Sequence, residues 1–509
     1  MALLPELHFV LSRERRAGVE GEQTLLSRCG GKDAAKNCGS REDGDEAQEK
    51  GGDESPHSMC KRVICYVAVG HVASRGAQGL PRVESPSILL DGEGSHCAYL
   101  KNVKTDKLGS TLNRRVFVRN AAVAVGGAAF GRSIGFPAQS HGEGSLKIPA
   151  AIIGCTGKGD YGHGLDLIFN NRDNVELVGI ADPISSGRAT AAARSKALRQ
   201  YDDYRVMLET EKPRLVCLAP RWTDQHHAMA LAAFRIGAHV YMEKPIAQNL
   251  AEADELLAAA GKAGLKVAVA HQMRLAPNVL HLKKRVEQGL LGELLQIRAY
   301  GKQDSRAGGE DMLVLGTHLF DLMRYFAGDA AWCMANVLQK GHSITAQDFH
   351  AARENIGPIA GDEIDAQFGF ANGVSGSFTS REKLRQNVGG WGMELIGSKT
   401  NARIMADIFP TVFILKAGSW QESGRTDHWE RLEDDPTLKA TAAERGTDMA
   451  NKRVVDDWLE AIQKNREPIC SGRAATKALE MVMAVYHAGL SGSRVTLPLT
   501  DRAHPLLAK

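Results

Sequence analysis

One lysine and one histidine stand in contexts that suit the removal of hydrogen from an alcohol. Lys244 follows the apolar run Gly237–Met242, within Glu243-Lys244-Pro245, and His318 follows Gly316-Thr317. Oxidising a carbinol carbon requires that the hydroxyl proton leave, and an imidazole with an unperturbed pKa of about 6.5 accepts it at neutral pH. An ammonium within reach lowers the hydroxyl pKa and holds the developing alkoxide. We therefore predict that Lys244 and His318 are catalytic.

A glycine-rich turn upstream, with an apolar strand on each side, predicts a nucleotide site. Ala150–Ile153 runs into Gly154-Cys155-Thr156-Gly157-Lys158-Gly159, and a second strand follows at Val175–Ala181. Glycines let the backbone approach a pyrophosphate, which the N-terminus of a following helix stabilises. Thr156 replaces the second glycine of the usual G-x-G-x-x-G pattern, and Gly157 supplies that freedom. The predicted cofactor contacts in this turn are Gly154, Thr156, Gly157 and Gly159.

An acid closes the second strand of this unit. Asp182 directly follows Val175–Ala181. At this place a carboxylate accepts hydrogen bonds from the ribose hydroxyls of the adenosine and repels a 2′-phosphate. The sequence therefore favours NAD over NADP.

With these features the chain resembles the Gfo/Idh/MocA family of glucose-fructose oxidoreductase, inositol dehydrogenase and rhizopine-catabolism proteins, over roughly residues 146 to 500. The motifs that carry the resemblance are Glu243-Lys244-Pro245, Lys212–Pro220 with His226-His227-Ala228, and Gly316–Leu322. It implies that Lys244 lies beside the nicotinamide and substrate, that the Pro245 bond is cis, and that His318 is the acid/base. Further cofactor contacts expected from these motifs are Pro220, His227, Glu243, Lys244 and Pro245.

One position departs from the family pattern. Many dehydrogenases of the family have an aspartate four residues before the histidine, and here that residue is Val314. The usual Asp–His proton relay is therefore absent, with Glu310 and Asp311 as the nearest acids to replace it. One helical turn after His318, Asp321 either orients the imidazole or, near a helix N-terminus, answers the helix dipole.

Beyond residue 145, apolar runs alternate with helical segments such as 249–263. Alternation of this kind predicts an α/β Rossmann domain over residues 146–270, with a doubly wound parallel sheet. Ligands bind at the carboxyl ends of such strands. The apolar runs lie near residues 149–154, 175–181, 214–219, 238–242 and 266–270.

After the last of these strands the pattern changes. A helix near 277–289 and strands near 293–301, 364–370, 374–380, 393–396 and 411–416 follow. They predict an α+β domain over 271–445 whose mainly antiparallel sheet has one open face. The resemblance implies that this face makes homodimer or homotetramer contacts. The last helices, near 447–464 and 472–490 within 446–509, are expected to pack back on the first domain.

Gln272 and Arg274 follow the last strand of the nucleotide domain, at the edge where ligands bind. They either contact substrate or cofactor or form an interdomain hydrogen bond. Together with Asp321 they are the predicted substrate-binding residues.

Composition narrows the class of protein. With 509 residues and 43% hydrophobic content, the chain can build more than one core. A formal net charge of +3 without a basic block argues against nucleic-acid binding, and the cysteine spacing predicts no metal site. A small carbohydrate-like molecule is the expected partner. The cysteines after residue 145 are expected to be reduced and buried; they are Cys155, Cys217, Cys333 and Cys470.

The leader differs from everything after it. Residues 1–110 are rich in charge and glycine without a sustained apolar period, so they are either disordered or precede the real start, near residues 108–112. Asn113-Arg114-Arg115 before the small-residue run Ala121–Phe130 resembles a twin-arginine export signal, so 111–145 is predicted to be signal and linker. This predicts a periplasmic or exported protein, with a cytoplasmic one as the alternative, that meets a membrane only through an uncleaved signal.

Three functions remain open. The first is an exported NAD(P)-dependent oxidoreductase acting on a CH–OH group of a sugar, polyol or sugar-derived substrate. Its cofactor would have to be tightly bound, since nicotinamide cofactors are scarce outside the cytoplasm. The second is an NAD-dependent glycoside hydrolase or lyase that uses transient oxidation, and the third is a nucleotide-binding protein without turnover.

Overall fold

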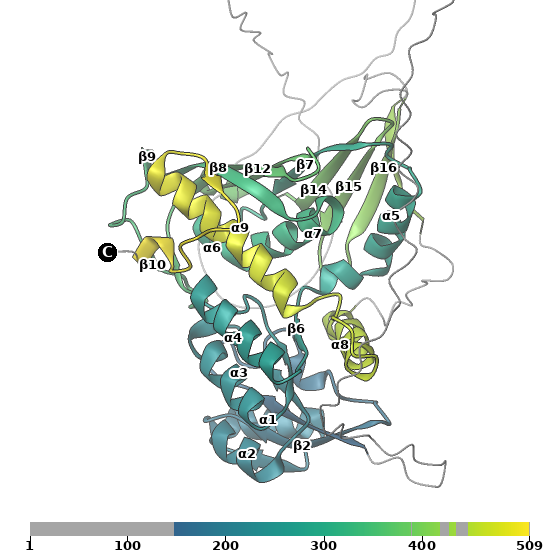
Figure 1. Ribbon diagram of the computed structural model, residues 1–509, viewed down its shortest axis with the longest axis vertical. Helices are drawn as coiled ribbons and strands as arrows, with labels where there is room; N and C mark the ends of the chain where they lie inside the picture. The colour runs from purple at the N-terminus through teal and green to yellow at the C-terminus, as the bar shows by residue number, and fades with distance from the viewer. Residues whose placement is uncertain (1–146, 388, 418–426, 434–445, 508–509) are drawn as a thin grey trace, which may run out of the picture. The chain divides into compact units, whose positions relative to one another are not determined.

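The computed structural model describes residues 147–387, 389–417, 427–433 and 446–507 (Figure 1). The predicted leader and the twin-arginine-type signal lie outside the described residues. The first domain is built on a six-stranded parallel sheet with the strand order β3-β2-β1-β4-β5-β6. Its strands are β1 (Ile148–Ile153), β2 (Val175–Ala181), β3 (Arg199–Tyr201), β4 (Leu215–Leu218), β5 (His239–Met242) and β6 (Val267–Val269).

This sheet confirms the predicted Rossmann domain. Strands β1, β4, β5 and β6 are nearly all buried, as continuous apolar runs in a parallel sheet should be. The strand order reverses between β1 and β4, which marks the carboxyl edge there as the place for a ligand. The accompanying helices are α1 (Ser185–Ser195), α2 (Tyr204–Glu211), α3 (His226–Arg235) and α4 (Leu250–Lys262).

The helix predicted directly after the glycine-rich turn is not formed. Between β1 and β2 the chain makes turns and a short 3₁₀ helix, η1 (Leu165–Leu167). Gly157, Gly159, Gly162 and Gly164 have φ of +82°, +84°, +58° and +77°, which no right-handed helix accommodates. A pyrophosphate at this loop therefore has no long helix dipole behind it.

The second domain contains a ten-stranded sheet in the order β17-β16-β15-β14-β7-β13-β12-β8-β18, with β9 paired to β8. All neighbours are antiparallel except β7 and β13, which confirms the mainly antiparallel prediction. The strands are β7 (Leu294–Tyr300), β8 (Ala330–Gln339), β9 (His342–Ser343), β12 (Glu363–Phe370), β13 (Ser375–Arg381), β14 (Trp391–Gly397), β15 (Asn401–Ala406), β16 (Thr411–Lys416), β17 (His428–Arg431) and β18 (Val495–Thr496). A small hairpin pairs β10 (His350–Ala351) with β11 (Pro358–Ile359).

Helices α5 (Pro277–Glu287), α7 (Thr317–Ala327) and α9 (Gly472–Ser491) lie along one face of this sheet (Figure 1). Side chains such as Arg298 and Gln367 are exposed on the other. The oligomer contact expected for that face stays a prediction.

The two C-terminal helices differ in where they pack. Helix α8 (Thr447–Gln463) packs against the first domain, where buried Trp458 lies 6.1 Å from the ring of Tyr241 between centroids. Helix α9 contacts α4 and β6 of the first domain and lies mainly along β8 and α7 of the second. It can pack on both because buried apolar side chains such as Leu479, Val482 and Tyr486 give it more than one apolar side.

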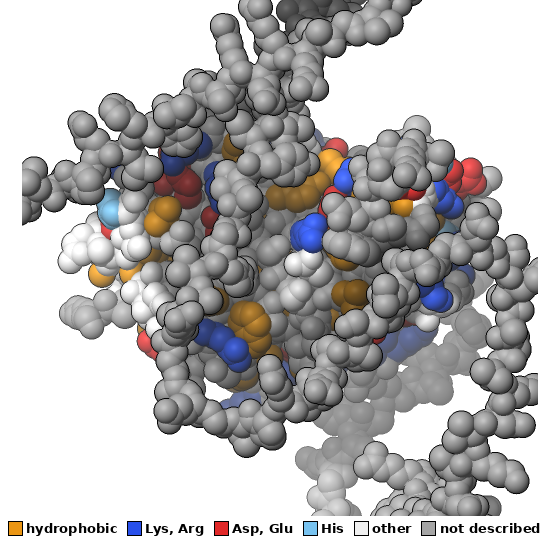
Figure 2. All heavy atoms as spheres, turned by 90° about the horizontal axis from the view of Figure 1, so that it is seen from above, with side chains coloured by type: hydrophobic (Ala, Val, Ile, Leu, Met, Phe, Trp, Pro, Cys, Tyr) orange, Lys and Arg blue, Asp and Glu red, His pale blue; other side chains and the backbone are white. Residues whose placement is uncertain are grey.

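The structure also bears on the cysteines, on membrane-spanning helices, on metal clusters and on the surface charges. Cys155, Cys217, Cys333 and Cys470 are free and buried, as predicted. Among the described residues no helix is long and apolar enough to cross a membrane, and no cluster of side chains suits a metal ion. Seen from the side of the second domain, basic, acidic and apolar side chains are interspersed (Figure 2).

Candidate active site

Lys244 lies just after β5 and is tightly restrained. The Lys244–Pro245 peptide is cis, as the family resemblance implied. The lysine is 5% exposed, and its Nζ donates to the carbonyl oxygen of Val314 at 2.9 Å. Burial lowers the pKa of Lys244, and the neighbouring Glu243 carboxylate opposes that shift. Among the described residues the ammonium has no other hydrogen-bond partner, so its remaining N–H groups can donate to a substrate oxygen.

The oxygen that holds Lys244 belongs to an irregular turn of helix. Residues Met312–Gly316 form a π-helix between α6 (Gly309–Asp311) and α7. A π turn shifts the backbone hydrogen-bond ladder and is frequent at functional sites. Many family members carry an aspartate at the position of Val314. In this chain the backbone carbonyl of Val314 accepts the hydrogen bond from Lys244.

The two acids considered as replacements are engaged elsewhere. Asp311 is fully buried and accepts hydrogen bonds from the Gln303 N–H at 2.9 Å and the Ser380 hydroxyl at 2.7 Å. Glu310 accepts from the backbone N–H of Glu354 at 3.3 Å. Burial raises the pKa of both carboxyls. Neither restores the missing Asp–His relay in this structure.

His318 lies at the start of α7, 5% exposed, with its Nδ1 unpartnered among the described residues. Its ring meets that of His271 edge to face, with centroids 5.3 Å apart. Burial, and then the Lys244 charge, hold the pKa of His318 well below its usual range. The imidazole is therefore neutral at neutral pH and able to accept a proton.

Asp321 and Arg274 form a buried ion pair at the start of the second domain. Arg274 is on η3 (Gln272–Leu275), and its Nε and Nη2 donate to the Asp321 carboxylate at 2.9 and 2.5 Å. The Asp321 carboxylate is therefore bonded to Arg274 rather than to His318. Because both residues follow the nucleotide domain in the chain, this pair is not the interdomain hydrogen bond offered as the alternative for Arg274. Substrate contact by Arg274, and by half-buried Gln272 on the same turn, stays a prediction.

A buried polar network that the sequence did not reveal holds the glycine loop to Glu243. His163 donates its backbone N–H and turns its Nδ1 to Glu243 Oε1, at 3.1 and 2.8 Å. Asn451, on α8, donates to the His163 carbonyl at 3.1 Å and accepts from the Tyr241 hydroxyl at 2.9 Å. Burial opposes ionisation of Glu243, but His163 and the Lys244 ammonium hold the pKa of Glu243 at about 2. Glu243 is thus a charged anchor for the loop.

The glycines of the loop serve different neighbours. A Cβ on Gly154 would lie 2.2 Å from the Tyr161 ring, and one on Gly159 2.4 Å from the Arg221 nitrogen. One on Gly162 would meet Glu243 at 2.6 Å. Only beside Gly157, among these four, is there nothing within 4 Å, so this is where a phosphate can approach the backbone.

The two histidines at the start of α3 have different partners. His226 is fully buried, and its two ring nitrogens lie 2.7 Å from the Pro220 carbonyl and 3.0 Å from the Pro245 carbonyl. His227 points away to Glu255 at 2.9 Å. His226 therefore joins the two proline loops, and His227 points elsewhere because successive helix residues point about 100° apart. The predicted cofactor contact of His227 stays a prediction. The doublet itself was the available signal, and position within it decided the role.

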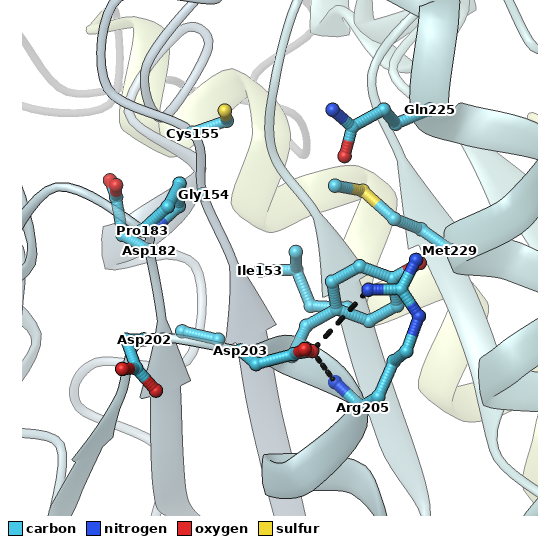
Figure 3. A pocket seen from close by; sticks show the side chains of 12 residues that line it. Ile153, Gly154, Cys155, Asp182, Pro183, Asp202, Asp203, Arg205, Gln225 and Met229 are labelled. Atoms are coloured by element: carbon cyan, nitrogen blue, oxygen red, sulfur yellow. Dashed lines mark hydrogen bonds and ion pairs between the residues drawn. The ribbon is translucent and has the colours of Figure 1, made fainter.

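A cavity of about 260 Å³ opens at the carboxyl ends of the strands β1 and β2 (Figure 3). Gly154 and Asp182 lie on one side of it and Met229 on the other. Asp182 is buried and already accepts from the Thr156 N–H at 3.0 Å and hydroxyl at 2.7 Å. Its role is thus to fix the loop as well as to line the cavity.

The residues present fit NAD. Asp202 and Asp203 line the same cavity as Asp182, and three carboxylates disfavour a 2′-phosphate. Near Lys244, outside this cavity, His318 Nδ1 and His271 Nε2 are buried polar atoms that lack partners in the described chain. Such atoms are expected where a ligand completes the hydrogen bonding. Sequence reasoning missed Asp202, Asp203, His163 and His271, although His271 stands directly before the predicted Gln272.

Comparison with known proteins gives the class of this site. Residues 148–271 match "Oxidoreductase family, NAD-binding Rossmann fold" of the Gfo/Idh/MocA group, and residues 283–497 match its "C-terminal alpha/beta domain". The chain belongs to the Gfo/Idh/MocA oxidoreductase family. The predictions of the family, of an NAD-dependent oxidoreductase and of NAD as cofactor are thereby confirmed.

Among similar characterised proteins is D-apiose dehydrogenase of Paraburkholderia graminis, 23% identical over 370 residues, which cover 70% of this chain and 92% of that protein. Levoglucosan dehydrogenase of Pseudarthrobacter phenanthrenivorans is 27% identical over 37% of this chain and 54% of its own length. Myo-inositol 2-dehydrogenase of Thermotoga maritima is 28% identical over 38% and 55%. The last two alignments thus span about half of each relative.

Solved structures show the same fold. An NAD-binding oxidoreductase from Klebsiella pneumoniae superposes with a TM-score of 0.57 at 18% identity, covering 70% of this chain and all of that one (100%). A levoglucosan dehydrogenase in complex with NADH and levoglucosan superposes with a TM-score of 0.55 at 19% identity, covering 70% and 100%. At these identities the likeness establishes the two-domain architecture.

Proposed function

We propose that this chain is an NAD-dependent dehydrogenase that oxidises a CH–OH group of a sugar, polyol or sugar-derived substrate. The observation that carries the proposal is that the Lys244 ammonium, which donates to the Val314 carbonyl at 2.9 Å, lies close enough to the buried imidazole of His318 to lower its pKa. The sugar and inositol dehydrogenases among its relatives support the substrate class.

The residues divide the work as follows. Bound NAD supplies the hydride acceptor for the carbinol carbon. The Lys244 ammonium donates to the substrate oxygen and stabilises the alkoxide as it forms. His318 accepts the hydroxyl proton, for which its lowered pKa keeps it in the neutral form. A carbonyl, NADH and a protonated imidazole are the products of the step.

Val314 favours a second candidate, the NAD-dependent glycoside hydrolase or lyase. Without a carboxylate beside His318, the proton has a less direct route out of the site, which suits a cycle that returns hydride and proton to the same substrate. In that case the enzyme would cleave a glycoside without accumulating NADH.

The experiment that separates the two incubates the purified full chain with NAD and a panel of free sugars, polyols and aryl glycosides. NADH absorbance is recorded together with glycoside cleavage. Stoichiometric NADH from a free sugar or polyol supports the dehydrogenase, and cleavage without NADH supports the glycosidase. If neither occurs while NAD binds, the protein acts as a nucleotide-binding protein without turnover.

Export is a separate proposal, supported by Asn113-Arg114-Arg115 ahead of the apolar run that ends at Phe130. Cells that produce the full chain are fractionated, with a variant carrying Arg114→Lys and Arg115→Lys as the control. If the protein is exported, the wild type should be found in the periplasm with NAD bound, and the variant should be absent from the periplasm. Equal cytoplasmic retention of both would contradict it.

A further inference from the structure

Two buried imidazole nitrogens lack partners, and they belong to rings that touch each other. His318 Nδ1 and His271 Nε2 have no hydrogen-bond partner among the described residues. The side chains are 5% and 3% exposed, and the ring centroids are 5.3 Å apart with the planes at 79°. A buried unpartnered polar atom destabilises a fold, so two of them in contact need an explanation.

The second nitrogen of His271 shows where its hydrogen lies. His271 Nδ1 is 4.0 Å from Asp321 Oδ1, too far for a hydrogen bond but close enough for a charge to act. A carboxylate on that side favours the tautomer with hydrogen on Nδ1, which leaves Nε2 as an acceptor. Burial lowers the pKa of His271 to about 4, so the ring is neutral and carries only one hydrogen on nitrogen.

We propose that His271 is a positioning residue for His318. When NAD is bound, His271 Nε2 accepts a hydrogen bond from His318 Nδ1–H, which leaves His318 Nε2 without a hydrogen and ready to take the hydroxyl proton. A single hydrogen bond then satisfies both unpartnered nitrogens. Bonds of this kind are often long in the free enzyme and tighten in the complex.

The resulting chain of contacts runs from His318 through His271 to Asp321. His271 follows strand β6, whereas an aspartate at position 314 would lie on the helical turn before His318. The proposed contact with His271 thus replaces the support that such an aspartate would give to His318. Asp321 remains anchored, because Arg274 donates to it and Arg324 lies 4.0 Å away. The charged or titratable groups that face His271 are Lys244 after β5, Arg274 on η3, and His318, Asp321 and Arg324 on α7.

A readout independent of activity is the tautomer of His318. The full chain, labelled with ¹⁵N-histidine and saturated with NAD, is studied by NMR, and the His318 resonances are assigned by their loss in His318→Gln. We expect Nδ1–H to be protected from solvent exchange in the wild type and in the control His239→Asn, and unprotected in His271→Phe. The control histidine is buried at the opposite edge of the sheet, where its Nδ1 accepts from the Lys266 N–H at 2.9 Å. Equal protection of His318 Nδ1–H in His271→Phe and in the wild type would overturn the proposal.

Kinetics give the second readout, and only this part rests on the proposed function. We expect His271→Phe to lower kcat about 100-fold, within the range of general acid/base effects, with KM and NAD affinity within about twofold. His271→Gln should recover part of the rate, because its amide oxygen can stand in for Nε2 as acceptor. Equal loss in both variants, or a loss confined to NAD affinity, would mean that the ring is merely structural.

The two readouts separate the two ideas. A protected His318 Nδ1–H that depends on His271, in a protein that oxidises no alcohol, would refute the proposed function and keep the hydrogen bond. Alcohol oxidation that is indifferent to His271→Phe would refute the positioning role and keep the function.

Discussion

The two ends of the cofactor site differ in how their buried polar groups are satisfied. At the adenosine end, Asp182 accepts from the N–H and hydroxyl of Thr156 and from the Ile184 N–H. At the reacting end, His271, His318 and Thr317 each keep a buried polar atom that has no partner in the described chain. The Asp182 carboxylate is therefore fully bonded in the free chain, whereas the polar atoms of the reacting end find partners only when a ligand is bound. Preorganised cofactor recognition and an incompletely bonded catalytic centre share one sheet edge.

The largest expected effect is at the reacting end. Lys244→Met keeps the length of the side chain and removes the ammonium, so we expect kcat to fall about 1000-fold, the loss typical of a charge-stabilising donor. NAD affinity, measured by calorimetry, should change little. Lys262→Met, at the exposed end of α4, is the control. A kcat in Lys244→Met that is comparable to that of the control would contradict the catalytic role of Lys244.

Within the glycine loop, two substitutions should separate packing from ligand approach. A Cβ at Gly162 would lie 2.6 Å from Glu243 and 2.7 Å from the Ala219 carbonyl, so Gly162→Ala should cost about 3 kcal/mol of unfolding free energy. Gly157→Ala faces open space and should cost only about 1–2 kcal/mol for its positive φ. Although Gly157→Ala should destabilise the fold less than Gly162→Ala, it should weaken NAD binding more, relative to the unfolding free energy that each substitution costs. Denaturant unfolding and NAD titration check both, and equal stability losses would refute the assignment.

Acid should weaken the anchor of that loop. The folded-state pKa of Glu243 is about 2, below its unfolded value, so its stabilising contribution is present above about pH 4.5 and is lost as the pH falls toward 2. The full contribution is about 3 kcal/mol, from the difference between the unfolded value of 4.5 and the folded value of about 2 at about 1.4 kcal/mol per pKa unit. Unfolding free energies of the wild type and of Glu243→Gln should converge as the pH is lowered through this window. A difference that stays constant with pH would show that Glu243 is not ionised in the fold.

The smallest effects distinguish the two adjacent histidines of α3. His226→Phe leaves the Pro220 and Pro245 carbonyls without their partner and should cost about 2 kcal/mol. His227→Gln removes only a surface pair with Glu255 and should change stability by about 0.5 kcal/mol or less. Thermal unfolding and NAD titration of both variants measure this. A larger loss of stability in His227→Gln than in His226→Phe would contradict these structural roles, and weaker NAD binding in His227→Gln would support the predicted cofactor contact.

The sequence predicted the parts of the fold that depend on local pattern. The buried strands β2 and β16 lie at their predicted residues, because period and apolar content identify them without tertiary information. The short strand β3 and the side on which α9 packs were not predictable, since neighbours in space decide them. The glycine loop shows the same limit: its positive φ angles are compatible with its glycines but are not encoded in their spacing.

For the site, the residue types were predictable and their partners were not. Lys244 and His318 were identifiable because the chemistry needs an ammonium and an imidazole, and both motifs are specific. That Arg274 pairs with Asp321, and that His163 pairs with Glu243 80 positions away, depends on how separate strand ends meet. Long-range pairs of this kind leave no periodic signal in the chain.

The most direct test of the central claim is a single-turnover measurement of NADH formation in the wild type and in His318→Ala, with NAD affinity measured on the same samples. The account predicts that both proteins bind NAD alike, while the variant forms NADH from a sugar or polyol about 100- to 10,000-fold more slowly. NADH formation at the wild-type rate in His318→Ala would contradict the account.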